Sequence, residues 1–433
     1  MGNRGPKGLV GLLAIALLAT GCSSGNGNGN GNGNGSGSGA GGDGGGSAVI
    51  EVDRPTALVD ESIRIRVTGL RAGEKVTVGS ESDDVNGTWR GKAAFTADPK
   101  GVVDLTEAQP ASGTYRTVDG MGLFWSMAPP PGADAAKRSF ELSHPDKQRS
   151  YTVRLTVASD RGTVAEREVT RVRMADGVRS RALFAGRDKV SGRIYEPPEG
   201  APERAPVLIF GGSEGGGFST RADAALLASR GHPTLSLCYF GCDGLPERLA
   251  NIPLEYFAAA ARLAAEQPGA KPGGVVAIGT SRGTEPAQLL AQHYPDLVRD
   301  VVLYAPSDRI EGGFPEYGKP AWTRGGKPLV TKSLIPYDRV RGTVLAIAGG
   351  DDTLWDTREF SKSIAARRDT REPHRALIHD EAGHAVGSYP HMPRSTFTWA
   401  DDLQDFYSLG GARPADARAR AETWPEVLTL LGR

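Results

Sequence analysis

The chain has 433 residues, with 51 Lys and Arg against 51 Asp and Glu, so its formal net charge is zero. This length allows two domains of ordinary size, each with its own core. A balanced charge gives no electrostatic reason for a polyanionic partner, which argues against nucleic-acid binding.

The N-terminus has the pattern of a secretory signal. Arg4 and Lys7 precede an apolar run, Leu9–Ala19, that is too short to span a membrane. The run ends in "LLATGC", and the small residues before Cys22 resemble the lipobox of bacterial lipoproteins. We expect residues 1–22 to be a signal peptide, and a lipid on Cys22 to anchor the mature chain in the bacterial cell envelope, outside the cytoplasm. The alternative is ordinary secretion with cleavage elsewhere.

Residues 23–47 are almost entirely Gly, Asn and Ser. Such a stretch has too few apolar side chains to form a core, so the sequence predicts a disordered, flexible tether.

From 48 to 174 the pattern is one of short runs in which apolar and polar residues alternate. Alternation with a period of two, interrupted by turn residues, predicts antiparallel strands and an immunoglobulin-like β-sandwich. We expect neither helices nor a catalytic cluster here. The predicted strands are residues 48–54, 62–70, 75–81, 150–159 and 163–174.

From 175 to 433 the pattern changes to apolar strands that alternate with helices. This predicts an α/β domain with a mostly parallel sheet covered by helices on both faces. Residues 311–337, with five Gly and four Pro, fit neither period, and we expect a lid or long loop. The predicted strands are 190–197, 206–212, 234–240, 274–280, 300–306, 343–350 and 375–379, and the predicted helices are 220–231, 253–267, 285–294, 357–368 and 397–410.

The pattern G-x-S-x-G occurs three times, around Ser23, Ser213 and Ser281. Ser23 lies in the predicted tether. A nucleophile elbow needs a strand before the serine and a helix directly after it, so that the helix N-terminus faces the developing charge. Only Ser281 has both, because a glycine-rich loop follows Ser213. We therefore predict that Ser281 is a nucleophile.

The loop around Ser213 follows an earlier strand, where α/β-hydrolases supply a backbone N–H to the oxyanion hole. We expect one donor from residues 212–214, with Ser213 and Glu214 as the candidates. The backbone N–H of Arg282, directly after the nucleophile, is the expected second donor. Glu285, in the first turn of the next helix, is expected to complement the helix dipole.

A serine nucleophile needs an acid and a base, in the chain order Ser, acid, His. Asp351 and Asp352 follow a predicted strand, and the spacing from the preceding glycine favours Asp352. Asp356 is expected to cap the next helix. His384 lies in the loop after the following strand and is the expected base, with His379 at the strand end as its rival.

With a lipid on Cys22, the remaining candidate thiols after processing are Cys238 and Cys242, in "LCYFGCDGLP". Disulfides persist in exported proteins, and the intervening Gly241 allows a turn that brings the two residues together. A disulfide is one alternative and two free thiols the other. No set of His or carboxylate residues has metal-ligand spacing, so neither a metal nor a cofactor is expected.

Several stretches resemble a known family, the acyl-CoA thioesterases and bile acid-CoA:amino acid N-acyltransferases. They are "GTYRTVDGMGLFWSM" in the first domain and "IFGGSEGG", "GTSRGTE", "GGDDTLW" and "DEAGH" in the second. The resemblance covers nearly all of the chain after the tether. It implies a β-sandwich followed by an α/β-hydrolase domain, with the triad on Ser281, Asp352 and His384.

These observations predict a serine acyl hydrolase that cleaves an acyl thioester or ester to a free acid. One alternative is an acyl-CoA:amino acid N-acyltransferase. In the resembling family those enzymes carry cysteine at the elbow position and the thioesterases mostly serine, so Ser281 favours hydrolysis. The other alternative is a non-catalytic lipoprotein that binds a ligand at the cell surface. Export leaves the leaving group open, since coenzyme A should be scarce outside the cytoplasm.

Overall fold

The computed structural model describes residues 47–215, 217–367, 373–400 and 405–433. Residues 45–433 form one compact unit. The signal peptide, Cys22 and the predicted tether up to residue 46 lie outside the described residues. Across the described ranges, no helix combines the length and apolar character needed to cross a membrane.

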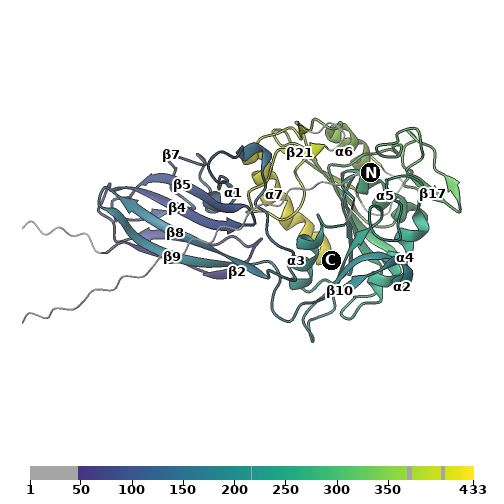
Figure 1. The fold of residues 1–433 in the computed structure, drawn as a ribbon, viewed down its shortest axis with the longest axis horizontal. Coiled ribbons are helices and arrows are strands. Elements are labelled where there is room, and N and C mark those ends of the chain that lie inside the picture. Colours follow the sequence, from purple (N-terminus) through teal and green to yellow (C-terminus); the bar gives the residue numbers. More distant parts are fainter. Residues whose placement is uncertain (1–46, 216, 368–372, 401–404) are drawn as a thin grey trace, which may run out of the picture. The chain divides into compact units, whose positions relative to one another are not determined.

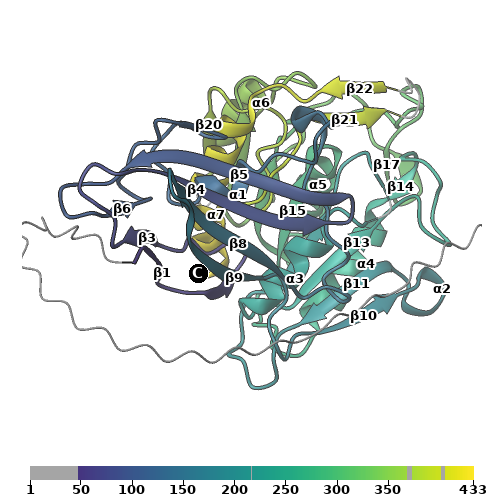
Figure 2. The same cartoon turned by 60° about the vertical axis from the view of Figure 1, so that its left-hand side comes forward.

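The N-terminal part consists of two sheets, one of six strands and one of three (Figures 1 and 2). Their strand orders are β2-β9-β8-β4-β5-β7 and β1-β3-β6, and only the β2–β9 pair is parallel. Inward side chains alternate with exposed ones, as in β4, where Val76 and Val78 are buried. The strands are β1 (Val49–Val52), β2 (Thr56–Leu58), β3 (Ile65–Thr68), β4 (Lys75–Asp84), β5 (Gly87–Thr96), β6 (Val103–Asp104), β7 (Ser112–Gly113), β8 (Ser150–Ser159) and β9 (Gly162–Val172).

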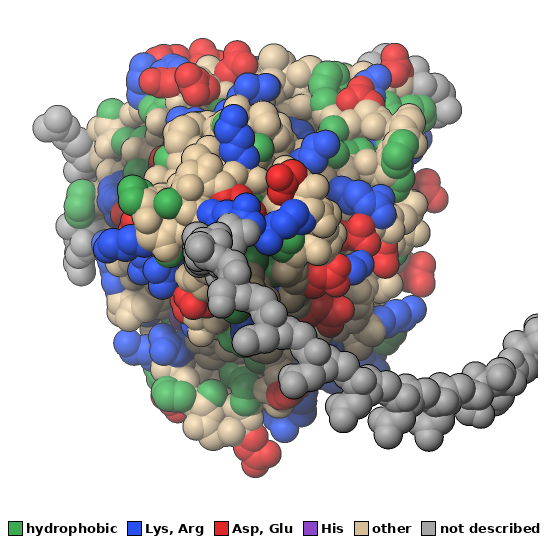
Figure 3. Space-filling model, turned by 90° about the vertical axis from the view of Figure 1, so that its left-hand side faces the viewer, with side chains coloured by type: hydrophobic (Ala, Val, Ile, Leu, Met, Phe, Trp, Pro, Cys, Tyr) green, Lys and Arg blue, Asp and Glu red, His purple; other side chains and the backbone are tan. Residues whose placement is uncertain are grey.

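Basic and acidic side chains are interspersed on the face drawn in Figure 3, and apolar side chains occur there singly or in small groups. Ion pairs on the strands of this part, such as Arg154 with Glu166 and Arg90 with Glu81, follow the same distribution. This mixture of signs is consistent with the zero net charge of the chain.

One expectation for this part is wrong, because a helical turn, α1 (Gly122–Trp125), interrupts it. Leu123 and Phe124 are fully buried, so core packing fixes the turn. Asp119 accepts a 2.6 Å hydrogen bond from the Trp125 indole. A Cβ on Gly122 would lie 2.2 Å from the Tyr115 ring, so only glycine fits there. This turn is the "GLFW" of the family resemblance.

The C-terminal part is built on an eight-stranded sheet in the order β10-β11-β13-β12-β15-β16-β19-β20. The first two strands are antiparallel to their neighbours and the other strands are parallel. All seven predicted strands are present, and β10 was not predicted. The strands are β10 (Arg179–Leu183), β11 (Ser191–Glu196), β12 (Val207–Phe210), β13 (Thr234–Cys238), β15 (Val275–Thr280), β16 (Val298–Tyr304), β19 (Val344–Gly349) and β20 (Arg375–His379).

Helices cover both faces of this sheet, as the alternation along β15 shows. Val276 and Ile278 belong to the core that contains α3 (Arg221–Ser229) and α7 (Arg413–Leu431). Val275 and Ala277 belong to the core that contains α4 (Leu254–Ala265) and α5 (Thr284–His293). The remaining helices are α2 (Ala185–Asp188) and α6 (Thr357–Ala365). The part is therefore of the α/β class.

The C-terminal end differs from the prediction. The helix expected over 397–410 is wrong, because the described residues of this stretch form the hairpin β21 (Phe397–Ala400) and β22 (Asp405–Ser408). Aromatic residues at alternate positions favour strands, and the Trp399 and Phe406 rings meet edge to face across the pair. The helix of this region is α7, which was not predicted.

Residues 311–337 are neither helical nor a bare loop. Within them, β17 (Trp322–Arg324) and β18 (Lys327–Pro328) join β14 (Ile252–Pro253) in a small sheet. Trp322 is fully buried, and its ring lies 5.9 Å from those of Tyr239 and Phe257. This segment is thus fixed to the C-terminal part by core packing.

Candidate active site

Ser281 lies on a strained turn between β15 and α5. Its φ is +52°, and a short 3₁₀ turn, Ser281–Gly283, leads directly into the helix. A positive φ is unfavourable for a residue with a Cβ and needs support from its surroundings. Here the support is tight packing, since a Cβ on Gly279 would lie 2.3 Å from the Gly283 carbonyl oxygen. A Cβ on Gly283 would lie 2.2 Å from the carbonyl oxygen of Gly211. The spacing of the motif is therefore a steric requirement.

His384 and Asp352 form the central polar pair of the site. His384 Nδ1 lies 2.7 Å from Asp352 Oδ2, and the side chains are only 9% and 1% exposed. An ionised carboxylate can only accept, so Nδ1 carries the hydrogen and Nε2 is the basic nitrogen. The second Asp352 oxygen accepts the Leu354 backbone N–H at 2.8 Å. The Asp352 carboxylate is therefore held at both of its oxygens.

Asp351 and His379, the alternatives for the acid and the base, have other partners. Asp351 accepts the Gly411 backbone N–H, and His379 Nδ1 lies 3.3 Å from a carboxylate oxygen of Glu422. Asp356 accepts a hydrogen bond at the start of α6, which confirms its prediction as an N-cap.

The three residues of the expected triad all follow strands of one parallel set. Ser281 follows β15, Asp352 comes shortly after β19, and His384 follows β20. Since these strands are parallel, their carboxyl ends meet at one edge of the sheet. The structure brings Asp352 and His384 into contact. In the described chain no hydrogen bond joins the Ser281 hydroxyl to His384, and such bonds commonly tighten only when substrate binds.

The glycine-rich loop after β12 lies directly against Ser281. A Cβ on Gly212 would be 2.9 Å from the Ser281 Cβ. The Gly212 N–H donates to Glu214 Oε2 at 2.9 Å, and the Ser219 hydroxyl donates to Glu214 Oε1 at 2.6 Å. The Gly212 amide is therefore engaged by a side chain, and Ser213 and Glu214 are the remaining candidate donors of residues 212–214.

A buried tyrosine fixes the carbonyl groups of this loop. The Tyr239 hydroxyl lies 2.7 Å from the Gly212 oxygen and 3.0 Å from the Gly211 oxygen. Tyr239 is 3% exposed, and burial raises the pKa of its hydroxyl, so it stays protonated and can donate. Nothing local in the sequence marked this residue, because its partners lie about 27 positions earlier.

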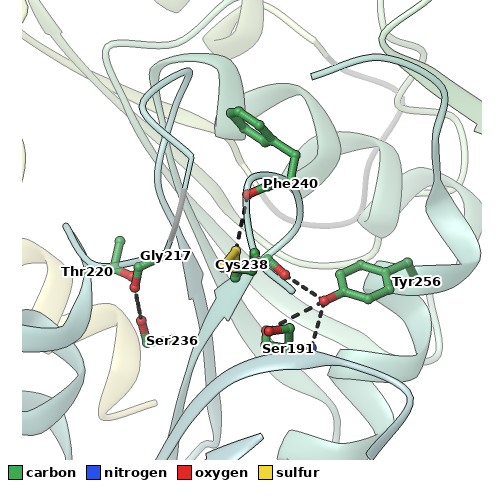
Figure 4. Close-up of a disulfide and its surroundings, with 8 residues drawn as sticks. Ser191, Gly217, Thr220, Ser236, Cys238, Phe240 and Tyr256 are labelled. Atoms are coloured by element: carbon green, nitrogen blue, oxygen red, sulfur yellow. Dashed lines mark hydrogen bonds between the residues drawn. A yellow bond between two sulfur atoms is a disulfide. The ribbon is translucent and has the colours of Figure 1, made fainter. Parts of the chain in front are cut away.

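A disulfide between Cys238 and Cys242, with Cα atoms 6.5 Å apart, closes the turn that carries Tyr239 (Figure 4). The Tyr256 hydroxyl donates to the Cys238 carbonyl and accepts the Ser191 backbone N–H at 2.8 Å (Figure 4). A Cβ on Gly217 would lie 2.9 Å from the Cys238 Cβ. The closed turn thus packs against the glycine-rich loop.

Glu285 has a larger role than complementing a helix dipole. It is fully buried and accepts from Arg282 Nε at 2.6 Å, from the Trp322 indole at 2.7 Å and from the Glu311 backbone N–H at 2.8 Å. Burial raises the pKa of this carboxyl, and the Arg282 guanidinium opposes that shift. Glu285 therefore ties the helix after Ser281 to residues 311–337.

Within the described residues, no group of three or more His, Cys, Asp or Glu side chains is arranged to hold a metal ion. The candidate site therefore consists of the Asp352–His384 pair, Ser281 on its turn and the backbone donors around it.

Comparison with known proteins gives the family. Residues 60–183 match the N-terminal region of the acyl-CoA thioester hydrolase/BAAT family, and residues 323–433 match its C-terminal region. The chain belongs to this family. The resemblance seen in the sequence is thereby confirmed.

Members of the acyl-CoA thioester hydrolase/BAAT family align with most of the chain. Acyl-coenzyme A amino acid N-acyltransferase 1 from Mus musculus is 29% identical over 401 residues, covering 86% of this chain and 94% of its own. Acyl-coenzyme A thioesterase 1 from Homo sapiens is 27% identical over 402 residues, covering 86% and 93%. Among solved structures, a dienelactone hydrolase-like promiscuous phosphotriesterase from metagenomic libraries is 17% identical, covers 59% of this chain and all of its own, and has a TM-score of 0.36.

Proposed function

We propose that the protein is a serine acyl hydrolase with an α/β-hydrolase fold, which cleaves an acyl thioester or ester to a free acid through an acyl-serine intermediate. The observation that carries the proposal is the buried 2.7 Å contact between His384 and Asp352 at the sheet edge that also bears Ser281. The mixed sheet and the family of acyl-CoA thioesterases support the same reading.

In the proposed acylation step, the Ser281 hydroxyl attacks the acyl carbon and its proton passes to His384 Nε2. Asp352 holds the imidazole in the required tautomer and stabilises the imidazolium that forms. The oxyanion is held by the backbone N–H of Arg282 and by that of Ser213 or Glu214. The tetrahedral intermediate then expels a thiol or alcohol, which takes the proton from His384.

Deacylation repeats this chemistry with water in place of the hydroxyl of Ser281. His384 takes a proton from the water as the water attacks the acyl-serine ester. The proton returns to the serine oxygen when the free acid leaves. The same oxyanion donors serve both steps, so losing one is expected to cost about 10²- to 10³-fold in kcat.

The test is covalent labelling with a fluorophosphonate probe, combined with turnover of acyl-CoA, acyl-pantetheine and simple esters of graded chain length. Ser281→Ala should abolish labelling and lower turnover by orders of magnitude. Ser213→Ala is the matched control, because only its backbone N–H is a proposed donor. Equal losses in both variants would refute the nucleophile, and unchanged turnover in Ser281→Ala would refute the mechanism. A chain that neither labels nor turns over would favour a ligand-binding lipoprotein.

Amine transfer is the second candidate, since relatives of similar identity are named N-acyltransferases. An acyl-serine is an oxyester, for which activated water is the better partner, whereas an acyl-cysteine thioester reacts readily with amines. With millimolar glycine or taurine present, free acid should dominate for the natural enzyme. Ser281→Cys should divert part of the product to the N-acyl amino acid, as mass spectrometry would show. Abundant N-acyl product from the unmodified enzyme would favour the transferase.

We also propose that the protein acts outside the cytoplasm, anchored in the cell envelope by a lipid on Cys22. Its support is the "LLATGC" boundary followed by a Gly/Asn tether. Expressed in a bacterium, the full chain should fractionate with membranes and Cys22→Ser should not. Identical soluble fractionation of both would contradict the anchor.

A further inference from the structure

Helix α7 contacts two distant regions of the chain. One is the loop that carries His384. The other is the N-terminal β-sheet part, including the "GLFW" turn, which has no part in the candidate active site. We propose that Asp416 and Arg420 of α7 are positioning residues for His384, and that the N-terminal part acts in catalysis by holding α7. This inference rests on the proposed function.

The first region that α7 contacts is the loop around His384. Asp416 Oδ1 accepts the backbone N–H of Gly383 at 2.8 Å, directly before the histidine. Arg420 Nη1 donates to the carbonyl of Ala385 at 2.7 Å, directly after it. The two side chains therefore hold the peptide groups that flank His384 on either side.

Both of these contacts are made in the interior. Asp416 is 1% exposed and Arg420 is 2% exposed. A hydrogen bond to a buried charged group is stronger than one between neutral groups, and its loss leaves that charge without a partner. Burying two charged side chains is costly, so their placement on the backbone beside His384 requires a reason. Orientation of the histidine supplies one.

The second region that α7 contacts is the N-terminal part. Arg413, in the first turn of α7, donates to the carbonyls of Met127 at 2.8 Å and Trp125 at 3.3 Å. Trp424, eleven residues further along α7, donates its indole N–H to the buried carboxylate of Asp60 at 2.6 Å. Figures 1 and 2 show α7 beside α1. The N-terminal part therefore holds α7 at two points, on either side of Asp416 and Arg420.

A helix transmits such restraint because it is rigid over this length. Arg413 and Arg420 are seven residues apart, which is about 10 Å of helix at 1.5 Å per residue. A displacement of α7 at Arg413 would therefore move the atoms that bond Gly383 and Ala385. Misplacing a catalytic group by 1 Å costs about 100-fold in rate, even when the cause is distant. The N-terminal part thereby contributes to kcat without contacting substrate.

The first test separates hydrogen bonding from folding at Asp416. Asp416→Ala removes the acceptor and should lower kcat about 10- to 100-fold with KM within twofold. Asp416→Asn keeps an acceptor oxygen for the Gly383 N–H and should restore kcat to within about threefold of the natural enzyme. Loss of kcat in Asp416→Asn equal to that in Asp416→Ala, or full activity in Asp416→Ala, would overturn the proposal.

The second test addresses the N-terminal part at Arg413, which is only partly buried, whereas Asp416 is fully buried. Arg413→Met keeps an unbranched stem but removes the hydrogen bonds to the carbonyls of Trp125 and Met127, and should lower kcat several-fold at unchanged KM. Arg418→Met is the matched control, because Arg418 lies on the same helix with a side chain 56% exposed, and should leave kcat unchanged. Equal effects of the two changes would overturn the proposal.

Failure of this inference can be told from failure of the proposed function. If Ser281→Ala abolishes turnover while Asp416→Ala and Arg413→Met do not lower it, only the role of α7 is refuted. If Ser281→Ala itself leaves turnover unchanged, the serine mechanism is refuted, and the role of α7 with it.

Discussion

Removing the hydroxyl of Tyr239 tests whether the glycine-rich loop is an oxyanion loop. Tyr239→Phe deletes one oxygen and leaves the ring, which packs against Phe240, Phe257 and Trp322. The carbonyl oxygens of Gly211 and Gly212 then lose their donor. The change therefore isolates the hydrogen bonds from the apolar packing.

Two magnitudes follow from this geometry. Leaving buried acceptors unpaired costs about 1–3 kcal/mol of folding stability. In a planar trans peptide the C=O and N–H point in opposite directions, so the bond to the Gly212 oxygen also sets where the Ser213 N–H points. Losing an oxyanion donor outright costs about 10²- to 10³-fold. Loosening one should therefore lower kcat about 10- to 100-fold, with little change in KM.

The assay combines steady-state kinetics on the best substrate with the thermal unfolding midpoint. Tyr195→Phe is the matched control, because Tyr195 is also buried and its hydroxyl donates to Asp146 at 3.0 Å. Both variants should lose similar stability, and only Tyr239→Phe should lose kcat. If kcat in Tyr239→Phe stays within twofold while stability falls as in the control, the oxyanion assignment of this loop is refuted.

Three further outcomes are expected. Glu285→Gln leaves the buried Arg282 without its counter-ion and should lower the free energy of unfolding by about 3–5 kcal/mol in urea titrations; a loss below 1 kcal/mol would contradict this. Replacing Cys238 and Cys242 with serine should cost about 2 kcal/mol, as expected for so short a loop, and should abolish the effect of reductant on the unfolding midpoint. Burial lowers the pKa of His391 to about 3, whereas the side chain in the unfolded state titrates near 6.5. Between these pH values the unfolded state binds more protons than the folded state, so the free energy of unfolding falls as the pH drops. His391→Asn, which suits the left-handed backbone at φ +72°, should therefore lessen the loss between pH 6 and pH 4 by about 1.4 kcal/mol per pH unit, and an unchanged slope would contradict this.

The features that the sequence predicted are local ones. The turn at Ser281 needs a strand before it, glycines at fixed spacing and a helix after it, and all of these lie within about twenty residues. The N-cap at Asp356 is equally local, because its acceptor and donor are three residues apart. The order of apolar segments was sufficient to place Asp352 and His384 after neighbouring strands.

The prediction failed where long-range contacts decide the structure. α7 begins with Pro414 in its first turn and contains Pro425, and its buried residues include the charged Asp416 and Arg420. A helix with charged side chains at core positions lacks a clear apolar stripe, so periodicity does not reveal it. The last helix was instead predicted over 397–410, where the described residues form the β21–β22 hairpin.

The charged residues that hid α7 from the sequence prediction are also the ones that hold a loop of the candidate site. Residues at the carboxyl ends of the strands leave the sheet, so their backbone N–H and C=O groups lose their strand partners and need others. Side chains from distant segments supply them: Tyr239 for the glycine-rich loop, Glu285 for residues 311–337, and Asp416 with Arg420 for the His384 loop. Each of these side chains is polar and buried, and therefore breaks the apolar pattern of its own segment. In this fold, buried polar residues that weaken a helix or strand prediction mark the segments that hold the candidate site in place.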